Sequence, residues 1–264
     1  MEKYKENIQA ENPLGTAPVG GLIRKFAIPA IISMLVSAMY NIVDQIFIGQ
    51  GVGMLGNAAT NVAFPVTTIA TAMALLLGIG GASNYNLEMG AGREKKASGI
   101  AGTALSSLAI SGAVLCVIVV LFLKPLLTLF GATKDVMPYA VDYTGITALG
   151  LPFYILSVGG NHVVRADRSP TYSMACVTAG AVINTILDPL FIFGFGWGIK
   201  GAAWATVIGQ VVSGILVVVY FWKFRKMYLE KSMLKPRLHY LKVITALGLA
   251  SCINQIAMAL VQIV

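Results

Sequence analysis

The sequence predicts an all-α membrane protein, because it is strongly apolar, sparsely charged and built from long apolar stretches. Of its 264 residues, 57% are hydrophobic and only 11% are charged. A soluble domain of this length needs more polar surface than that composition supplies. Several stretches also reach the roughly 20 residues that a helix needs to cross a hydrocarbon core.

The predicted membrane helices follow one another along the chain with short connections. Six of them are expected at residues 22–48, 55–81, 97–123, 136–160, 172–195 and 201–222, and a seventh at 241–264. The sequence therefore divides into a polar N-terminal segment (1–21), a six-helix unit (22–222), a basic linker (223–240) and a further helix (241–264).

The basic residues alternate between the two ends of these helices in a way that predicts topology. Sixteen of the nineteen lie before or at the start of the first helix, after the second, after the fourth, or between the end of the sixth and the start of the seventh; the exceptions are Lys124, Lys134 and Lys200. Cytoplasmic loops carry such an excess of Lys and Arg. We therefore expect a multi-pass protein of the cell membrane whose N-terminus and linker, including Lys3, Lys5, Arg225 and Lys226, are cytoplasmic.

Several other classes of protein are disfavoured. The net charge of +8 is explained by topology, so no basic patch remains to indicate nucleic-acid binding. The first 20 residues have no apolar core and are not a cleavable signal peptide. Nucleophile motifs, phosphate loops and metal-ligand spacings are missing from the sequence, which argues against an enzyme, and no cofactor is expected.

Cysteine and histidine give no sign of a metal or redox centre. Cys116, Cys176 and Cys252 are isolated in apolar stretches, where they are expected to be small core residues. His162 and His239 lie near helix ends and are expected to be solvated or interfacial.

Small residues recur every four positions in two of the predicted helices, the third and the sixth. They are Gly99, Thr103, Ser107 and Ser111 in the former, and Gly201, Ala205, Gly209 and Ser213 in the latter. Such stripes let helix backbones approach closely in lipid. They predict a compact bundle.

Two carboxylates, Asp44 and Asp188, lie deep in apolar segments. An acid at membrane depth costs about 2.5–3.5 kcal/mol on insertion scales, so a chain that retains one is expected to use it. Tyr40 precedes Asp44 by four residues and Asn184 precedes Asp188 by four, so each acid has a polar neighbour on its own helix face. Glu88 and Asp142 lie closer to helix ends and are expected to be solvated.

Two prolines add to this polar pattern. Pro29 and Pro189 remove backbone donors, which leaves the carbonyls of Lys25 and Thr185 without their usual partners. Helices interrupted in this way can bend or bind cations. The acids and prolines together predict an ion-coupled membrane transporter.

At these residues the chain resembles the MATE (multidrug and toxic compound extrusion) family, in particular its DinF-like and MepA-like branch. The resemblance is carried by Asn184-x-x-x-Asp188-Pro189, by Gly198-x-x-Gly201-Ala202-Ala203-x-Ala205-Thr206 with Gln210, by Pro29, Tyr40 and Asp44, by Gly90-Ala91-Gly92 and by Arg165-Ala166-Asp167. One departure is Arg168, where the family usually has Gly.

The resemblance implies a fold and a set of site residues. It implies two six-helix lobes, of which this chain covers the first and begins the second, so that the C-terminal lobe is missing. It implies that Tyr40, Asp44, Asn184, Asp188 and Thr206 bind the coupling H⁺ or Na⁺, and that Pro29 kinks the first helix. No other metal is implied, and any Na⁺ is expected at Asp44, Asn184 and Asp188.

The function expected on this basis is antiport, in which an inward cation gradient drives export of organic, often cationic compounds. The expected partners are these compounds, the lipid bilayer and the missing C-terminal lobe. Two alternatives stay open. A lipid-linked oligosaccharide flippase would be favoured by a cavity rich in Arg and Lys. A non-transporting membrane fragment or assembly partner is the other.

Overall fold

A computed structural model of the protein describes residues 18–224, 227 and 229–263. The expectations that concern residues 1–17, including Lys3 and Lys5, and those on Arg225, Lys226 and Val264 fall outside these residues. The described part of the chain is helical and contains no strand. Seven of its helices are long and apolar enough to cross a membrane, which agrees with the predicted fold class.

The helices lie close to their predicted positions. They are α3 (Val19–Gly51), α4 (Met54–Gly90), α5 (Glu94–Leu121), the short α6 (Leu123–Leu129), α7 (Met137–Ala166), α8 (Pro170–Pro189), α9 (Ile199–Val219) and α10 (Leu238–Ile263). Two π-helical turns, η1 (Leu190–Gly194) and η2 (Tyr220–Phe224), extend α8 and α9, and a 3-10 turn, η3 (Lys231–Leu234), precedes α10.

Two boundaries differ from the prediction for identifiable reasons. The third predicted span breaks at Phe122, because Pro125 fits the first turn of α6 but not the interior of a longer helix. The second helix continues to Gly90, where Gly92, with φ 73°, permits the turn toward α5.

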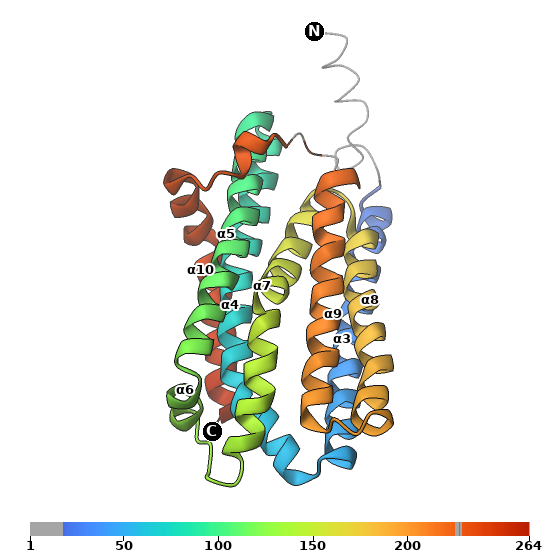
Figure 1. Ribbon diagram of the computed structural model, residues 1–264. Helices are drawn as coiled ribbons and strands as arrows, with labels where there is room; N and C mark the ends of the chain where they lie inside the picture. Colours follow the sequence, from blue (N-terminus) through green and yellow to red (C-terminus); the bar gives the residue numbers. More distant parts are fainter. Residues whose placement is uncertain (1–17, 225–226, 228, 264) are drawn as a thin grey trace.

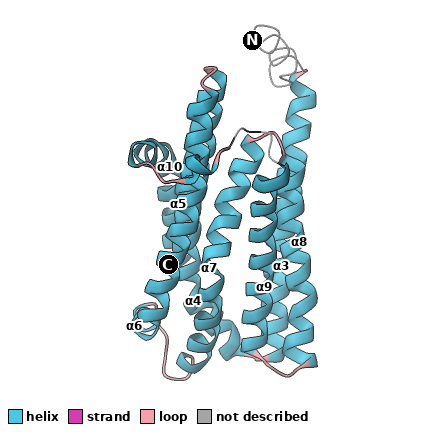
Figure 2. Ribbon diagram, turned by 45° about the horizontal axis from the view of Figure 1, so that its top comes forward, coloured by secondary structure: helices cyan, strands magenta, loops and turns pink. Residues whose placement is uncertain are grey.

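The helices form two groups with α7 between them. In both views α3, α8 and α9 stand together on one side, and α4, α5 and α10 on the other (Figure 1 and Figure 2). Although α3 and α4 are consecutive, α3 packs mainly against α8. We call the end of the bundle with the α4–α5 turn, the α7–α8 turn and the linker the basic end.

Glycines allow close helix contacts, and one of these glycines, Gly209, belongs to a predicted small-residue stripe. A Cβ atom on Gly209 of α9 would lie 2.8 Å from the carbonyl oxygen of Gly180 on α8. A Cβ on Gly78 of α4 would lie 2.5 Å from the Cα atom of Gly159 on α7. Backbones at this separation gain dispersion contacts that larger residues would prevent.

The N-terminal half of α10 is fastened to α4. Ile244 is fully buried, the space beside Gly80 is filled by the Ile244 carbonyl, and Gly248 contacts the carbonyl of Leu76. Farther along, α10 exposes Leu249 and Ile253 among other apolar side chains. The predicted start of a second lobe is thus packed on the first through its initial turns.

A buried carboxylate ties several elements together at the basic end. Asp167, 2% exposed, accepts hydrogen bonds from the hydroxyl of Tyr220 at 2.7 Å and from that of Tyr85 at 3.4 Å. The next residue, Arg168, has φ 60°, in the left-handed region that favours glycine. This backbone conformation explains why a Gly is usual at this position in the family that the sequence resembles.

The two acids expected to be solvated keep side-chain exposures of 13% for Glu88 and 42% for Asp142, and both also form ion pairs. Glu88 contacts Arg93 and lies 2.8 Å from the Nζ atom of Lys96. Asp142 lies 3.3 Å from the Nζ atom of Lys200. A basic side chain thus lies close in space to each of these helix ends.

We expect Gly248→Ala to lower the stability of the protein by about 1–3 kcal/mol, because the added methyl group would meet the backbone of Leu76 in a packed contact. Thermal unfolding in detergent micelles measures this loss. Gly21→Ala in α3 is the matched control, since a Cβ there would have no neighbour within 4 Å. Equal melting of the two variants would contradict the proposed close contact.

Candidate functional site

The structure brings the two membrane-depth acids, Asp44 of α3 and Asp188 of α8, to one place. Asp44 is 6% exposed and Asp188 is fully buried. Their carboxyl groups lie close enough to interact directly with each other. Among the described residues, none of the ion pairs includes either acid. Two facing carboxylates without a base repel each other unless a cation or proton lies between them.

Asn184 connects Asp188 to α9. In the amide orientation that satisfies both ends, its nitrogen donates to Asp188 Oδ2 at 3.2 Å and its oxygen accepts from the backbone N–H of Thr206 at 3.2 Å. Asn184 is 3% exposed, so both bonds are shielded from water. The spacing of four residues on α8 accounts for the first bond.

Two tyrosines complete the cluster. Tyr40, one turn before Asp44, lies close enough to both acids to interact with them electrostatically. Tyr143 of α7 lies close enough to the same acids, and to the side chain of Thr206, to interact with them electrostatically. Sequence reasoning missed Tyr143, because the acids that it approaches lie on other helices.

The two prolines of the predicted site, Pro29 and Pro189, lie inside α3 and at the end of α8. Helix α3 continues through Pro29, whose carbonyl accepts a hydrogen bond from the Ser33 hydroxyl at 2.7 Å. The kink expected at Pro29 stays a prediction. Helix α8 ends at Pro189 and gives way to the π-helical turn η1.

A cavity of about 590 Å³ runs along the cluster between α3, α7, α8 and α9. Tyr40, Asn184 and Thr206 line it toward the acids, and Asn161 and Arg165 toward the basic end. It therefore connects the acid pair with the basic end of the bundle.

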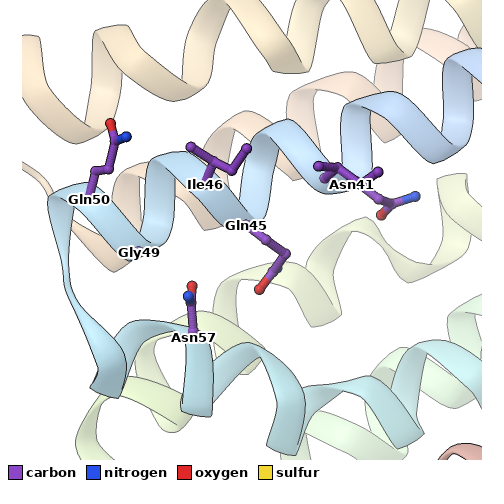
Figure 3. Close-up of a pocket in the computed structure, with 7 residues that line it drawn as sticks. Asn41, Gln45, Ile46, Gly49, Gln50 and Asn57 are labelled. Atoms are coloured by element: carbon purple, nitrogen blue, oxygen red, sulfur yellow. The ribbon is translucent and has the colours of Figure 1, made fainter.

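A second cavity of about 650 Å³ lies between α3 and α4, where the two helices diverge. Figure 3 shows Asn41, Gln45 and Gln50 on α3 and Asn57 on α4 around it. Gln45 donates to Asp44 Oδ2 at 3.4 Å and accepts from Thr60 at 3.0 Å. This amide thus bridges the acid pair and the cavity, a role that no sequence pattern indicated.

The described residues contain no group of three His, Cys, Asp or Glu side chains that could bind a metal ion. Oxygen ligands for a small cation are nevertheless present, because Asp44 and Asp188 face each other and Asp44 Oδ1 has no hydrogen-bond partner. Cys116, Cys176 and Cys252 are free thiols.

The fold and the paired acids are those of a multi-pass membrane protein of the transporter class. A family model described as MatE matches residues 29–190, which is more than half of the chain. The chain belongs to this family.

Named relatives agree with that membership. An FAD transporter of Shewanella oneidensis is 32% identical over 212 residues, covering 77% of this chain and 47% of the relative. The multidrug export protein MepA of Staphylococcus haemolyticus is 29% identical, covering 74% and 43%. The chain spans about half the length of the curated relatives it matches.

Solved structures show the same fold. The MATE multidrug transporter DinF-BH aligns with a TM-score of 0.88 and 36% identity, over 94% of this chain and 56% of that one. An outward-facing multidrug resistance MATE family transporter aligns with a TM-score of 0.82 and 28% identity, over 90% and 53%. The predicted DinF-like and MepA-like resemblance is confirmed.

The contact between the acids predicts that Asp44→Asn and Asp188→Asn change stability non-additively. Either substitution alone removes the repulsion, so the double variant should deviate from the sum by more than about 0.5 kcal/mol. Thermal unfolding of the two single variants and the double variant measures the coupling. Glu88→Gln combined with Asp188→Asn is the control and should be additive; additivity in both pairs would mean that the acids do not share a site.

Proposed function

We propose that this chain forms the cation-binding lobe of an antiporter that exports organic compounds. The observation that carries the proposal is the pair of buried carboxyl groups, Asp44 and Asp188, on two helices at membrane depth. A proton or Na⁺ at this pair would remove the repulsion between them. The site residues are Tyr40, Asp44, Asn184, Asp188 and Thr206, with Tyr143 as an addition.

The attachment of α3 makes the pair a suitable switch. Asp44 and Ile48 are the buried residues of α3, and the helix packs mainly on α8. A proton or cation bound at the acid pair would therefore change the contact between α3 and α8. A cation that binds one packing of α3 more tightly than another shifts the population between them, and substrate affinity would shift with it.

The cavity along the pair supports export of organic compounds over the flippase alternative. Among the described residues that line it, Arg165 is the one Arg or Lys side chain, whereas many Arg and Lys side chains were expected for a flippase. The names of the relatives, multidrug export protein and FAD transporter, cover chemically diverse organic compounds. We propose such compounds as substrates.

We further propose that residues 22–222 act as one lobe and that α10 begins a second lobe, which the remaining half of the protein would supply. The basic end would face the cytoplasm of a cell membrane. In support, the α4–α5 turn and the linker lie at the same end as the start of α3 (Figure 1). That end carries Arg24, Arg93 and Arg237 among other bases.

Asp188→Asn should abolish gradient-driven efflux while leaving membrane insertion intact, because the neutral amide cannot exchange a proton or balance a bound Na⁺. The assay is efflux of a fluorescent organic cation from vesicles that contain an intact two-lobe protein with this sequence. The ion-paired Glu88 supplies the control, Glu88→Gln, which should transport normally. Unchanged coupled efflux by the Asp188→Asn protein would refute the proposal.

The proposed orientation predicts which surface cysteines a membrane-impermeant reagent can reach. With the three native cysteines replaced by alanine, Lys95→Cys should be labelled only after cells are opened, since it lies at the basic end. Lys134→Cys, in the loop before α7, should be labelled on intact cells. The reverse pattern would show that the N-terminus is outside.

A further inference from the structure

The cavity beside the acid pair has a base at its other end. Arg165 lies in the last turn of α7 and lines both the 590 Å³ cavity and a smaller one of about 350 Å³ between α3, α4 and α7. His162, one turn earlier, lines both cavities as well. The two residues thus form the boundary between these cavities at the basic end.

The guanidinium of Arg165 is not neutralised by an acid within the described residues. Its Nε atom donates to the backbone carbonyl of Asn161 at 3.3 Å, and an Nη atom lies 3.4 Å from the ring of His162. The neighbouring acids are engaged elsewhere: Glu88 pairs with Arg93 and Lys96, and Asp167 accepts from the tyrosine hydroxyls. A positive charge at the carboxyl end of a helix is favourable in itself. This favourable helix-end interaction alone does not explain why the Arg165 side chain lines two cavities.

Deeper in the same cavity, two side-chain amide oxygens lack hydrogen-bond partners. Asn161 is 2% exposed, and its Oδ1 atom makes no hydrogen bond; the Oε1 atom of Gln210 is likewise buried without one. A buried acceptor without a partner costs about 1–3 kcal/mol. A ligand with a hydrogen-bond donor would remove that cost.

We propose that Arg165, with His162 beside it, binds the carboxylate or phosphate group of an organic compound in this cavity, while Asn161 and Gln210 accept hydrogen bonds from its donors. Guanidinium groups bind carboxylates and phosphates through paired, charge-assisted hydrogen bonds. The cavity would thus accept compounds with an anionic group, and not only the cations that the acids favour. The inference rests on the proposed function only in taking this cavity as the substrate site.

The test is a binding titration with two forms of one rhodamine dye, the free carboxylic acid and its ethyl ester, followed by fluorescence anisotropy. The intact protein is placed in nanodiscs of neutral phosphatidylcholine. Arg165→Gln should weaken binding of the acid by about tenfold or more, since one charge-assisted contact is lost. Binding of the ester should stay unchanged.

Two further variants separate recognition from structure. Arg165→Lys keeps the charge and should restore part of the affinity for the acid. Arg24→Gln removes an exposed base from the same end of the bundle and should affect neither dye. If Arg165→Gln weakens both dyes equally, or leaves the acid unaffected, or if the acid does not bind at all, the proposal is wrong.

A lipid phosphate has the same chemistry as a soluble anion, and a second titration distinguishes the two. Displacement of the acid by anionic phosphatidylglycerol in the discs, in the unmutated protein but not in Arg165→Gln, would assign the anion site to lipid headgroups. Retained binding would assign it to soluble compounds. Because binding is measured without a gradient, the anion site can stand even if the Asp188→Asn protein still exports, and it can fail while coupled export holds.

Discussion

Two carboxyl groups share one buried place in this protein, and under the proposed function the position of α3 would depend on how their charge is balanced. Asp44 and Asp188 face each other without a base among the described residues. In a low-dielectric environment the repulsion between two such charges is many times what it would be in water. Under the proposed function, the contact between α3 and α8 would depend on a proton or a cation at this pair.

The other helices of the bundle are held together by close backbone contacts. Glycines bring the backbones of α4 and α7 together at Gly78 and Gly159, and those of α8 and α9 at Gly180 and Gly209. Such contacts have little freedom to adjust, because any shift meets backbone atoms. Asp167 adds a hydrogen bond with the Tyr220 hydroxyl at the basic end. Under the proposed function, α3 would respond to the charge of the acid pair while these close contacts hold the other helices together.

Hydropathy alone predicted the helices, because a membrane span is a property of local composition. It could not predict α6, which depends on the position of Pro125, or the burial of Ile244 in the first turns of α10. Within one helix, the spacing of Asn184 and Asp188 predicted their contact. The meeting of Asp44 with Asp188 came from family resemblance, since periodicity carries no information on which helices become neighbours. The contacts of Tyr143 with the acids on α3 and α8, and of Gln45 with Thr60 on α4, were missed for the same reason, because they join different helices.

The separation of the two acids along the chain has a consequence for biosynthesis. Asp44 leaves the ribosome well over a hundred residues before Asp188, and at usual rates of synthesis the interval is on the order of ten seconds. During that time the first helix carries its acid into the membrane without the partner that later faces it. Insertion of α3 and assembly of the acid pair are thus successive events, and the nascent chain must tolerate a solitary carboxyl group until α8 arrives.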